Sequence, residues 1–244
     1  FIACESFTEL LNKVSSENCL GLLPVENSIA GTVNEAYEEL INSGLEIFGE
    51  YIKKIDHTLI GLSNSKFEEI THVISHPQAL QQCSKFLQDS KLRITPVFDT
   101  AGSVFEILET KDINTAAIAG EHFKNDERFK ILKENISNHQ ENFTRFLLIG
   151  NEKLESNKEN NKYSSVLISD DKPGSLLKAL NIFSDLNINL TKLESRPILG
   201  RPWEYKFYID YELQNVKTQM ELIDGIKKVS KEFIILGHYP KANP

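Results

Sequence analysis

Cysteine and long apolar runs are scarce in this 244-residue chain. Its three cysteines, Cys4, Cys19 and Cys83, are an odd number without metal-like spacing, so we expect reduced, mostly buried thiols and no disulfide framework. No apolar run approaches the ~18 residues of a membrane span, and no signal peptide opens the chain. These absences predict a cytoplasmic protein without a membrane partner.

The charge balance is acidic, with 27 basic and 35 acidic residues and a formal net charge of −8. Nucleic acid and anionic membranes bind cationic faces, so this balance disfavours both as partners. With 40% hydrophobic and 25% charged residues, the composition is typical of a soluble globular protein. The length allows one large domain or two moderate ones.

Short apolar runs alternate with segments of helical period over the first 150 residues. This alternation predicts α/β layers with largely parallel strands, and two α/β lobes fit it best. One of the expected helices takes Pro77 in its first turn, where proline is favoured. We therefore expect a two-lobed α/β domain over residues 1–150.

The remainder of the chain has a different pattern. Residues 151–162 contain a single apolar side chain, too few to offset the entropy of ordering them, which indicates a linker. Residues 163–244 then show strand and helix patterns in the order βαββαβ. This order predicts a second, α+β domain of the ferredoxin-like type.

The segment Asn142 to Phe146 places a carboxamide, a hydroxyl and a guanidinium within four residues, ahead of an apolar strand. Arg145 presents a planar fork suited to a carboxylate. Thr144 beside a fixed cation can pass a proton to a leaving oxygen if the pocket excludes water. Because side chains alternate along a strand, Arg145 would point away from Thr144 and could instead brace the lobe.

Three more motifs accompany this segment, at residues 21–33, 75–83 and 193–197. In their order and spacing, the four motifs closely resemble the prephenate dehydratase family followed by its ACT regulatory domain. The resemblance covers nearly the whole chain. The strings at 81–87, 196–198 and 202–204 look most like the bifunctional chorismate mutase/prephenate dehydratases.

The resemblance implies a catalytic domain built like a periplasmic binding protein, with the substrate between its lobes. It implies conversion of prephenate to phenylpyruvate in phenylalanine biosynthesis, without metal or organic cofactor and with feedback inhibition by L-phenylalanine. Arogenate dehydratase is the nearest alternative, since one acceptor in the pocket could select an amino group over a keto oxygen. A noncatalytic amino-acid sensor is an alternative of another class.

The expected catalytic residues are Glu26, Asn27 and Ser28 together with Thr144 and Arg145. Asn27 and Ser28 would donate hydrogen bonds to substrate oxygens, whereas Glu26 could orient a donor or take part in proton transfer. Expected substrate-binding residues are Gln78, Gln81, Thr100, Asn142 and Phe146.

Two further side chains in the same region are weaker candidates. His76 lacks an evident acidic partner and sits at a helix start, so a catalytic role for it is the less favoured reading. Cys83 is expected on the body of the helix that takes Pro77 in its first turn, and it has neither a base nor an electropositive neighbour that would make it a nucleophile.

The resemblance also implies a site for L-phenylalanine in the ACT domain. Gly174 would let backbone approach the effector carboxylate at a helix start, and the end of the following strand would complete the site. The expected residues are Gly174, Ser175, Leu176, Asn187, Asn189, Leu190, Glu194, Ser195, Arg196 and Pro197. One chain carries half of such a pocket, so we expect a homodimer or a dimer of dimers.

Two departures from the family pattern bear on the catalytic domain. The chain opens at Phe1, without the family's usual strand and Gly-Pro-x-Gly-x-x-Ser turn, so we expect a fragment that lacks one βα unit. Residues 121–129 are charged where the family more often carries small residues, which indicates a solvated, altered helix.

Overall fold

The computed structural model describes residues 2–151 and 160–243 and divides into two compact units. Unit 1 consists of Phe1–Lys53 and Thr144–Pro244, and unit 2 of Lys54–Phe143. The chain therefore passes between the units twice. Within the described ranges, no helix is long and apolar enough to cross a membrane.

The described residues of unit 1 form four helices and most of the strands. Its helices are α1 (Phe7–Glu17), α2 (Asn34–Ser43), α6 (Ser175–Asp185) and α7 (Val216–Lys227). Its strands are β1 (Gly21–Asn27), β2 (Gly31–Thr32), β3 (Glu46–Lys54), β9 (Phe143–Gly150), β10 (Lys162–Ser169), β11 (Asn189–Ile198), β12 (Arg201–Glu212) and β13 (Ser230–Tyr239).

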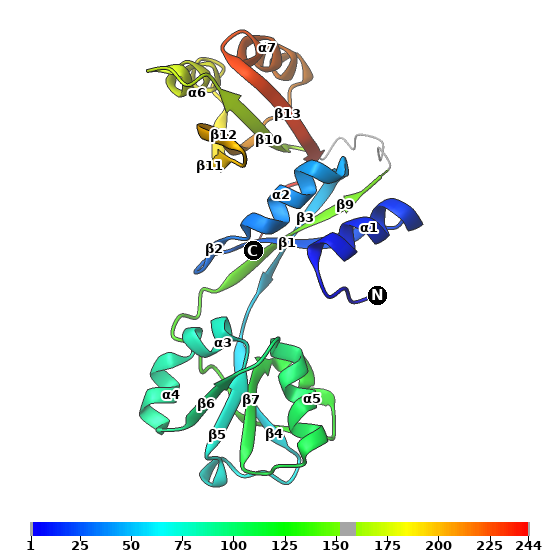
Figure 1. The fold of residues 1–244 in the computed structure, drawn as a ribbon, viewed down its shortest axis with the longest axis vertical. Coiled ribbons are helices and arrows are strands. Elements are labelled where there is room, and N and C mark those ends of the chain that lie inside the picture. Colours follow the sequence, from blue (N-terminus) through cyan, green and yellow to red (C-terminus); the bar gives the residue numbers. More distant parts are fainter. Residues whose placement is uncertain (1, 152–159, 244) are drawn as a thin grey trace. The chain divides into compact units, whose positions relative to one another are not determined.

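These strands form one eight-stranded sheet in the order β11-β12-β10-β13-β3-β9-β1-β2. The first four strands, with α6 and α7, make the βαββαβ unit that the sequence predicts (Figure 1). The apolar sides of α6 and α7 pack on one face of these strands. The other face joins α1, α2 and strands β1, β3 and β9 in a shared core.

One close contact connects the two halves of this sheet. Gly237 on β13 pairs in parallel with Ile47 on β3. A Cβ added at Gly237 would overlap the backbone oxygen of Ile47 and lie 2.6 Å from its Cβ. Glycine is therefore required for the two strands to approach this closely.

Unit 2 is a three-layer arrangement around a five-stranded sheet. Its strands are β4 (His57–Leu62), β5 (His72–Ser75), β6 (Arg93–Pro96), β7 (Thr115–Gly120) and β8 (Phe129–Lys133), in the order β6-β5-β7-β4-β8. Helices α3 (Pro77–Gln82) and α4 (Ser84–Ser90) pack in one apolar cluster, and α5 (Thr100–Thr110) packs in another. Two short 3₁₀ turns, η1 (Phe67–Glu69) and η2 (Glu121–Asn125), complete the unit.

Three expectations from the sequence need correction. Among the described strand pairs of the first 150 residues, only β5–β6 and β5–β7 are parallel, so the strands are not largely parallel. The helix that begins at Pro77 breaks at Cys83, because this residue leaves helical geometry with φ −112° and ψ 15°. Residues 121–129 form a 3₁₀ turn followed by the start of β8, and no α-helix.

The expected linker lies mostly outside the described residues, which omit 152–159. Its last residue, Lys162, belongs to β10 and is buried. The three cysteines are free, but only Cys83 is buried, whereas Cys4 is half-buried and Cys19 is exposed. The expectation of free thiols is thus confirmed, and the expectation that most are buried is wrong.

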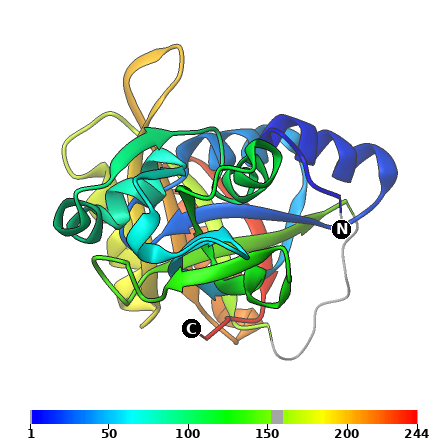
Figure 2. The same cartoon turned by 90° about the horizontal axis from the view of Figure 1, so that it is seen from below.

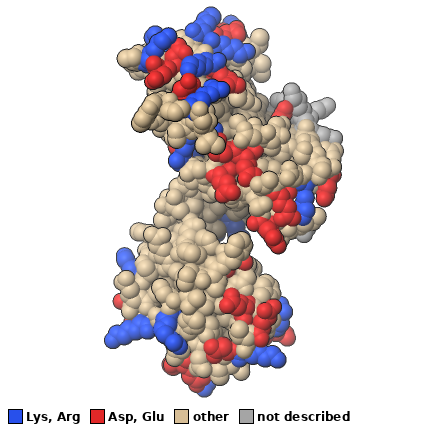
Figure 3. Space-filling model, in the orientation of Figure 1, with Lys and Arg blue, Asp and Glu red and all other residues tan. Residues whose placement is uncertain are grey.

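Two surface features of unit 1 are visible in the figures. Acidic side chains gather over α1 and α2, where Glu9 and Glu35 lie in the first helical turns (Figure 3). The hairpin between β11 and β12 projects from the sheet (gold in Figure 2). At this hairpin Leu199 is 98% and Trp203 79% exposed.

Candidate active site

Strands β1 and β9 bring two expected site residues together. They pair antiparallel, with Asn27 opposite Thr144 and Glu26 opposite Arg145. Asn27 donates from Nδ2 to Oγ1 of Thr144 at 3.1 Å. Its Oδ1 accepts from the backbone N–H groups of Ile29 and Ala30 at 3.1 and 2.9 Å. The turn after β1 therefore fixes which end of the carboxamide faces Thr144.

This orientation decides what the Thr144 hydroxyl can do. A threonine hydroxyl has one proton to donate and two lone pairs to accept with. Since Oγ1 accepts from Asn27, its own proton points elsewhere. Thr144 is therefore arranged as a proton donor, and the side-chain amide of Asn27 holds its hydroxyl in place.

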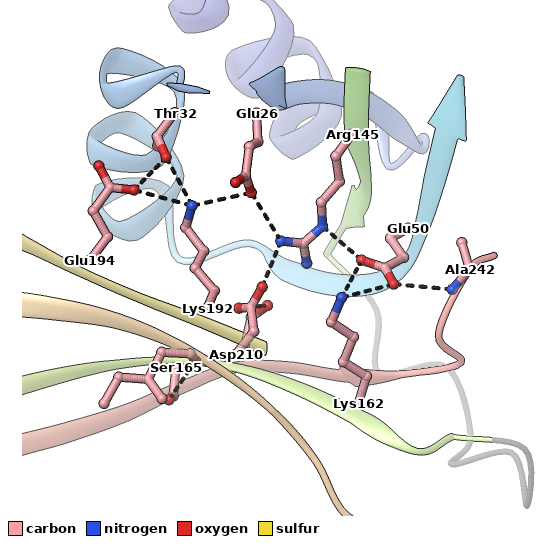
Figure 4. Close-up of polar contacts among 12 residues, drawn as sticks. Glu26, Thr32, Glu50, Arg145, Lys162, Ser165, Lys192, Glu194, Asp210 and Ala242 are labelled. Atoms are coloured by element: carbon pink, nitrogen blue, oxygen red, sulfur yellow. Dashed lines mark hydrogen bonds and ion pairs between the residues drawn. The ribbon is translucent and has the colours of Figure 1, made fainter. Parts of the chain in front are cut away.

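Arg145 points to the other side of β9, as strand alternation predicts, and its guanidinium is held by protein groups (Figure 4). Nε donates to Glu50 at 2.7 Å, Nη1 to Asp210 at 2.5 Å and Nη2 to the hydroxyl of Tyr239 at 2.9 Å. Only 11% of the side chain is exposed. These contacts favour the bracing role for Arg145, while its role as a substrate clamp stays a prediction.

The partners of Arg145 are themselves buried and connected. The side chain of Glu50 is fully buried, and it also accepts from Lys162 Nζ at 2.9 Å and from the backbone N–H of Ala242 at 3.0 Å. Burial alone would lower the pKa of Arg145, but the nearby Asp210 and Glu50 carboxylates outweigh it and the pKa is raised. Two carboxylates and two cations thus compensate each other inside unit 1, an arrangement that tolerates loss of a partner poorly.

Glu26 lies between two cations. Its Oε2 is 3.1 Å from Lys192 Nζ and 3.7 Å from Arg145 Nη1, and about a third of the side chain is exposed. Of the two roles left open by the sequence, this geometry favours orientation of neighbouring groups. Ser28 lies exposed in the turn that follows Asn27.

Two of the expected substrate-binding residues of unit 2, Gln78 and Thr100, lie at the starts of helices. Strands β5 and β6 are parallel, so the helices that follow them, α3 and α5, begin at the same edge of the sheet. Gln78 and Gln81 are exposed on α3, and Thr100 begins α5. His76 caps α3, because its Nδ1 accepts from the backbone N–H of Gln78 at 3.2 Å.

Asn142 is fully buried, which the sequence did not indicate. Its Nδ2 donates to Oε1 of Gln82 at 3.0 Å, and the same oxygen contacts Nε2 of His57 at 2.7 Å. Gln82, and not the exposed Gln81, therefore contacts the segment that leads into Thr144. No motif marks His57, and only its place just after the first crossing between units could have drawn attention to it.

The two remaining expectations concern Phe146 and Cys83. Phe146 is half-buried, and its ring centroid lies 6.4 Å from that of Tyr51. Burial raises the pKa of Cys83 to about 12, so this thiol is not activated as a nucleophile. Among the described residues, no group of His, Cys, Asp or Glu side chains could hold a metal ion.

The expected effector residues separate into two groups within one chain. Gly174, Ser175 and Leu176 line a cavity of about 360 Å³ together with Trp203 and Tyr205. Gly174 has φ +80°, a left-handed conformation that favours glycine just before α6. This cavity lies where backbone can approach a ligand at the start of the helix.

Glu194 and Arg196 line a different cavity, of about 570 Å³, with Glu26, Thr32 and Lys192. The strand register explains the separation. Glu194 is opposite Tyr208, whose ring belongs to the core shared with α2, whereas Ser195 is opposite Phe207, which packs on the α6 and α7 side.

The other expected effector residues are distributed around β11. Asn187 has φ +54° in the turn before the strand, and Asn189 is exposed at its start. Leu190 packs in the core beneath α6, and Pro197 lines a third cavity near the β11–β12 hairpin. The predicted set is therefore not a single pocket in one chain.

Comparison with known sequences finds relatives that are all named as prephenate dehydratases, alone or together with a second activity. The family model for prephenate dehydratase matches residues 1–154. The chain is 38% identical over 240 residues to prephenate dehydratase of Methanocaldococcus jannaschii, covering 97% of this chain and 86% of that protein. It is 30% identical over 244 residues to the bifunctional chorismate mutase/prephenate dehydratase of Escherichia coli K12 (98% and 63% covered). It is 34% identical over 235 residues to the chloroplastic arogenate dehydratase/prephenate dehydratase 1 of Arabidopsis thaliana (90% and 60%).

Three solved structures share the fold. A protein described as a novel type of quorum-quenching acylase has a TM-score of 0.88 at 26% identity, with 99% of this chain and 89% of that chain covered. Prephenate dehydratase from Staphylococcus aureus has a TM-score of 0.85 at 25% identity (98% and 89%). Prephenate dehydratase from Arthrobacter aurescens, solved in complex with L-Phe, has a TM-score of 0.85 at 24% identity (99% and 81%).

The chain spans less than two thirds of the bifunctional and plant relatives but most of the M. jannaschii protein. The family match extends over more than half of the chain and includes the Asn142 to Phe146 segment and the Glu26 to Ser28 segment. The chain belongs to the prephenate dehydratase family.

Proposed function

We propose that this chain converts prephenate to phenylpyruvate. In that reaction the bond between the ring and its carboxylate breaks, and the electron pair enters the ring as the 4-hydroxyl departs. The hydroxyl takes up a proton, so the products are water, carbon dioxide and an aromatic keto acid. The aromatic product supplies the driving force, and the protein must supply the proton and hold a dianion.

The hydrogen bond from Asn27 to Thr144 carries this proposal. Because Thr144 Oγ1 accepts from Asn27, its proton is available for the departing hydroxyl. A positioned donor of this kind typically contributes about 10²- to 10⁴-fold to a rate. Thr144 acts as the proton donor or positions it, and Asn27 holds the hydroxyl in the orientation that donation needs.

Around this pair, Arg145 braces strand β9 through Glu50 and Asp210, and Glu26 orients the end of β1. The residues that hold the substrate carboxylates come from the predicted set. The side chains of Ser28, Gln78, Gln81 and Thr100 have the hydrogen-bonding groups for this role, whereas Phe146 would make apolar contact with the substrate and Asn142 would act through its bond to Gln82. Of these, Ser28, Gln78 and Gln81 are exposed and suited to direct contact.

L-phenylalanine is the proposed effector, and the cavity at the start of α6 is its proposed site. Strand β11 forms one edge of the eight-stranded sheet, which leaves its outer hydrogen-bonding groups available to another strand. Exposed apolar residues lie nearby, including Leu177, Leu193 and Trp203. These features support a homodimer in which a second copy completes the effector site, in the cytoplasm as the sequence predicts.

Turnover of prephenate and arogenate by the purified chain, followed by product absorbance, tests the proposal. We expect formation of phenylpyruvate from prephenate and slower conversion of arogenate. Preference for arogenate would reassign the substrate. Binding of L-phenylalanine without turnover of either compound would support the noncatalytic sensor.

Calorimetry with L-phenylalanine tests the effector site. Gly174→Val should abolish binding, because a β-branched residue is strained at φ +80°. Gly44→Val is a matched control, since Gly44 has φ +72° at the end of α2 and does not line this cavity. Equal loss of binding in both variants would place the effector elsewhere.

A further inference from the structure

Lys192 on β11 connects the proposed catalytic and effector regions, although no motif includes it. Its Nζ is 3.1 Å from Glu26, 3.1 Å from Glu194 and 2.8 Å from the hydroxyl of Thr32 (Figure 4). An ammonium group has three protons to donate, and three acceptors surround this one. Only 8% of the side chain is exposed, and Nζ lies 5.6 Å from the ring centroid of Tyr37.

The acceptors come from two parts of unit 1 that are distant in sequence. Glu26 is the next-to-last residue of β1 and immediately precedes Asn27, which holds Thr144. Thr32 lies on β2, which pairs with the end of β1. Lys192 therefore joins β11 to β1, whose Asn27 holds the proposed proton donor Thr144.

On its other side, Lys192 contacts the strand end that the sequence assigns to phenylalanine sensing. Glu194 accepts a hydrogen bond from Arg196 and another from Thr32. These side chains face β1 and β2, and not the cavity at Gly174. They are thus placed so that a movement of β11 would be transmitted to β1, the strand that carries Glu26 and Asn27.

We propose that Lys192 is a positioning residue that transmits the effector-bound state from β11 to Glu26 and the end of β1. The proposal rests on the proposed function and specifies how that site is regulated. A buried ammonium cannot exchange one carboxylate for water at low cost, so a shift of β11 must move Glu26 or break its ion pair. Either change alters the support of Asn27 and Thr144.

A second lysine separates this role from simple bracing. Lys206 on β12 also joins the βαββαβ part to the first part of the chain, by an ion pair with Glu38 on helix α2. Tyr208 donates to the same carboxylate at 2.8 Å. Lys206 is as buried as Lys192, with 11% of its side chain exposed, but its carboxylate partner is Glu38 and not Glu26. Lys206→Met is therefore the matched control.

The experiment compares Lys192→Met, Thr32→Val and Lys206→Met with the wild-type chain. The readout is kcat/KM for prephenate without and with saturating L-phenylalanine, together with the calorimetric Kd for L-phenylalanine. Allosteric coupling typically changes affinity about 5- to 150-fold. We define the inhibition ratio as kcat/KM without L-phenylalanine divided by kcat/KM with it. In Lys192→Met we expect this ratio to fall to within about twofold of 1. L-phenylalanine should still bind this variant, and Lys206→Met should keep the wild-type ratio.

Thr32→Val removes the hydroxyl that bridges Lys192 and Glu194 without changing charge, so it decides the question if Lys192→Met fails to fold. It should lower the ratio in the same direction. A wild-type ratio in Lys192→Met, or in Thr32→Val where that variant must decide, overturns the proposal. An equal fall of the inhibition ratio in Lys206→Met also overturns the proposal. Loss of any contact between the βαββαβ part and the first part of the chain would then be enough to abolish inhibition.

Hydrogen–deuterium exchange provides a readout that does not depend on turnover. L-phenylalanine should change exchange in residues 26–32 of the wild-type chain, and this change should disappear in Lys192→Met. If the wild-type chain shows the change but does not convert prephenate, the coupling stands and the proposed dehydratase activity fails. If the change persists in Lys192→Met, the coupling role is wrong whatever the activity. Absence of phenylalanine binding to the wild-type chain overturns the coupling as well.

Discussion

Asn27 donates a hydrogen bond of 3.1 Å to Oγ1 of Thr144 from a position 117 residues earlier in the chain. The antiparallel register of β1 and β9 places the two residues opposite each other. The amide oxygen of Asn27 is engaged by the following turn, so only its N–H group can face the hydroxyl. The direction of this hydrogen bond leads to the first two predictions.

Replacement of Thr144 should lower turnover much more than substrate binding. Thr144→Val keeps the shape of the side chain but removes the proton donor, and we expect kcat for prephenate to fall about 10²- to 10⁴-fold. Thr144→Ser should keep most of the activity. Steady-state kinetics measure both. The control is Thr58→Val, which removes a hydroxyl that donates to the backbone oxygen of Ala119 within unit 2. A near-normal kcat in Thr144→Val would contradict the assignment of Thr144 as the proton donor.

Asn27→Asp should reverse the hydrogen bond without changing the size of the side chain. A carboxylate only accepts, so the Thr144 hydroxyl would donate its proton to the introduced carboxylate and not to the substrate. We expect kcat to fall about as far as in Thr144→Val, on the order of 10²-fold or more. Circular dichroism should show an intact fold. Wild-type kcat in the folded variant would show that the orientation of the hydroxyl is unimportant.

Arg145→Met should destabilise the protein, because it leaves the buried Glu50 and Asp210 without their shared cation. Loss of one partner of a buried ion pair typically costs about 3–5 kcal/mol. Urea denaturation measures the loss. If Arg145 instead clamps the substrate, stability should hardly change while KM rises, so the two measurements together distinguish the brace from the clamp.

Gly237→Ala should weaken the junction between β13 and β3. The added Cβ would overlap the backbone oxygen of Ile47, so one strand must shift. Overpacking of this kind costs about 1–3 kcal/mol. Gly49→Ala is the control on β3, since the nearest atom to its Cβ would be 3.8 Å away. Similar unfolding midpoints for the two variants would contradict the close-approach argument.

Stability should decrease at mildly acidic pH because of His57. Burial lowers the pKa of this histidine, and its Nδ1 has no hydrogen-bond partner within the described part of the chain. The unfolded chain, with a histidine pKa of about 6.5, therefore binds more protons than the folded chain as the pH falls below that value. The stability present above pH ~6.5 should then be lost progressively toward the lowered folded pKa.

His57→Gln should reduce this pH dependence of the free energy of unfolding, measured by urea denaturation between about pH 7 and pH 5. Burial also lowers the pKa of His238, so a residual slope of the same sign should remain in the variant. An unchanged slope in His57→Gln would show that this histidine does not contribute.

Local patterns in the sequence determined much of this architecture. Apolar periodicity is a property of neighbouring residues, so it predicted the βαββαβ unit and the strand at Leu147 to Ile149. The four motifs at residues 21–33, 75–83, 142–146 and 193–197, taken together in their order and spacing, likewise indicated the family without any structure. Strand alternation was enough to place the two side chains on opposite faces of β9.

Only the tertiary structure decided what these side chains contact. The partners of Arg145 come from β3, β12 and β13, and Lys192 meets Glu26 across strands that are far apart in sequence. No local periodicity encodes such pairings, because strand register and the packing of one sheet face on α2 set them. The same long-range packing separated Glu194 and Arg196 from Gly174, which the sequence had placed in one effector set.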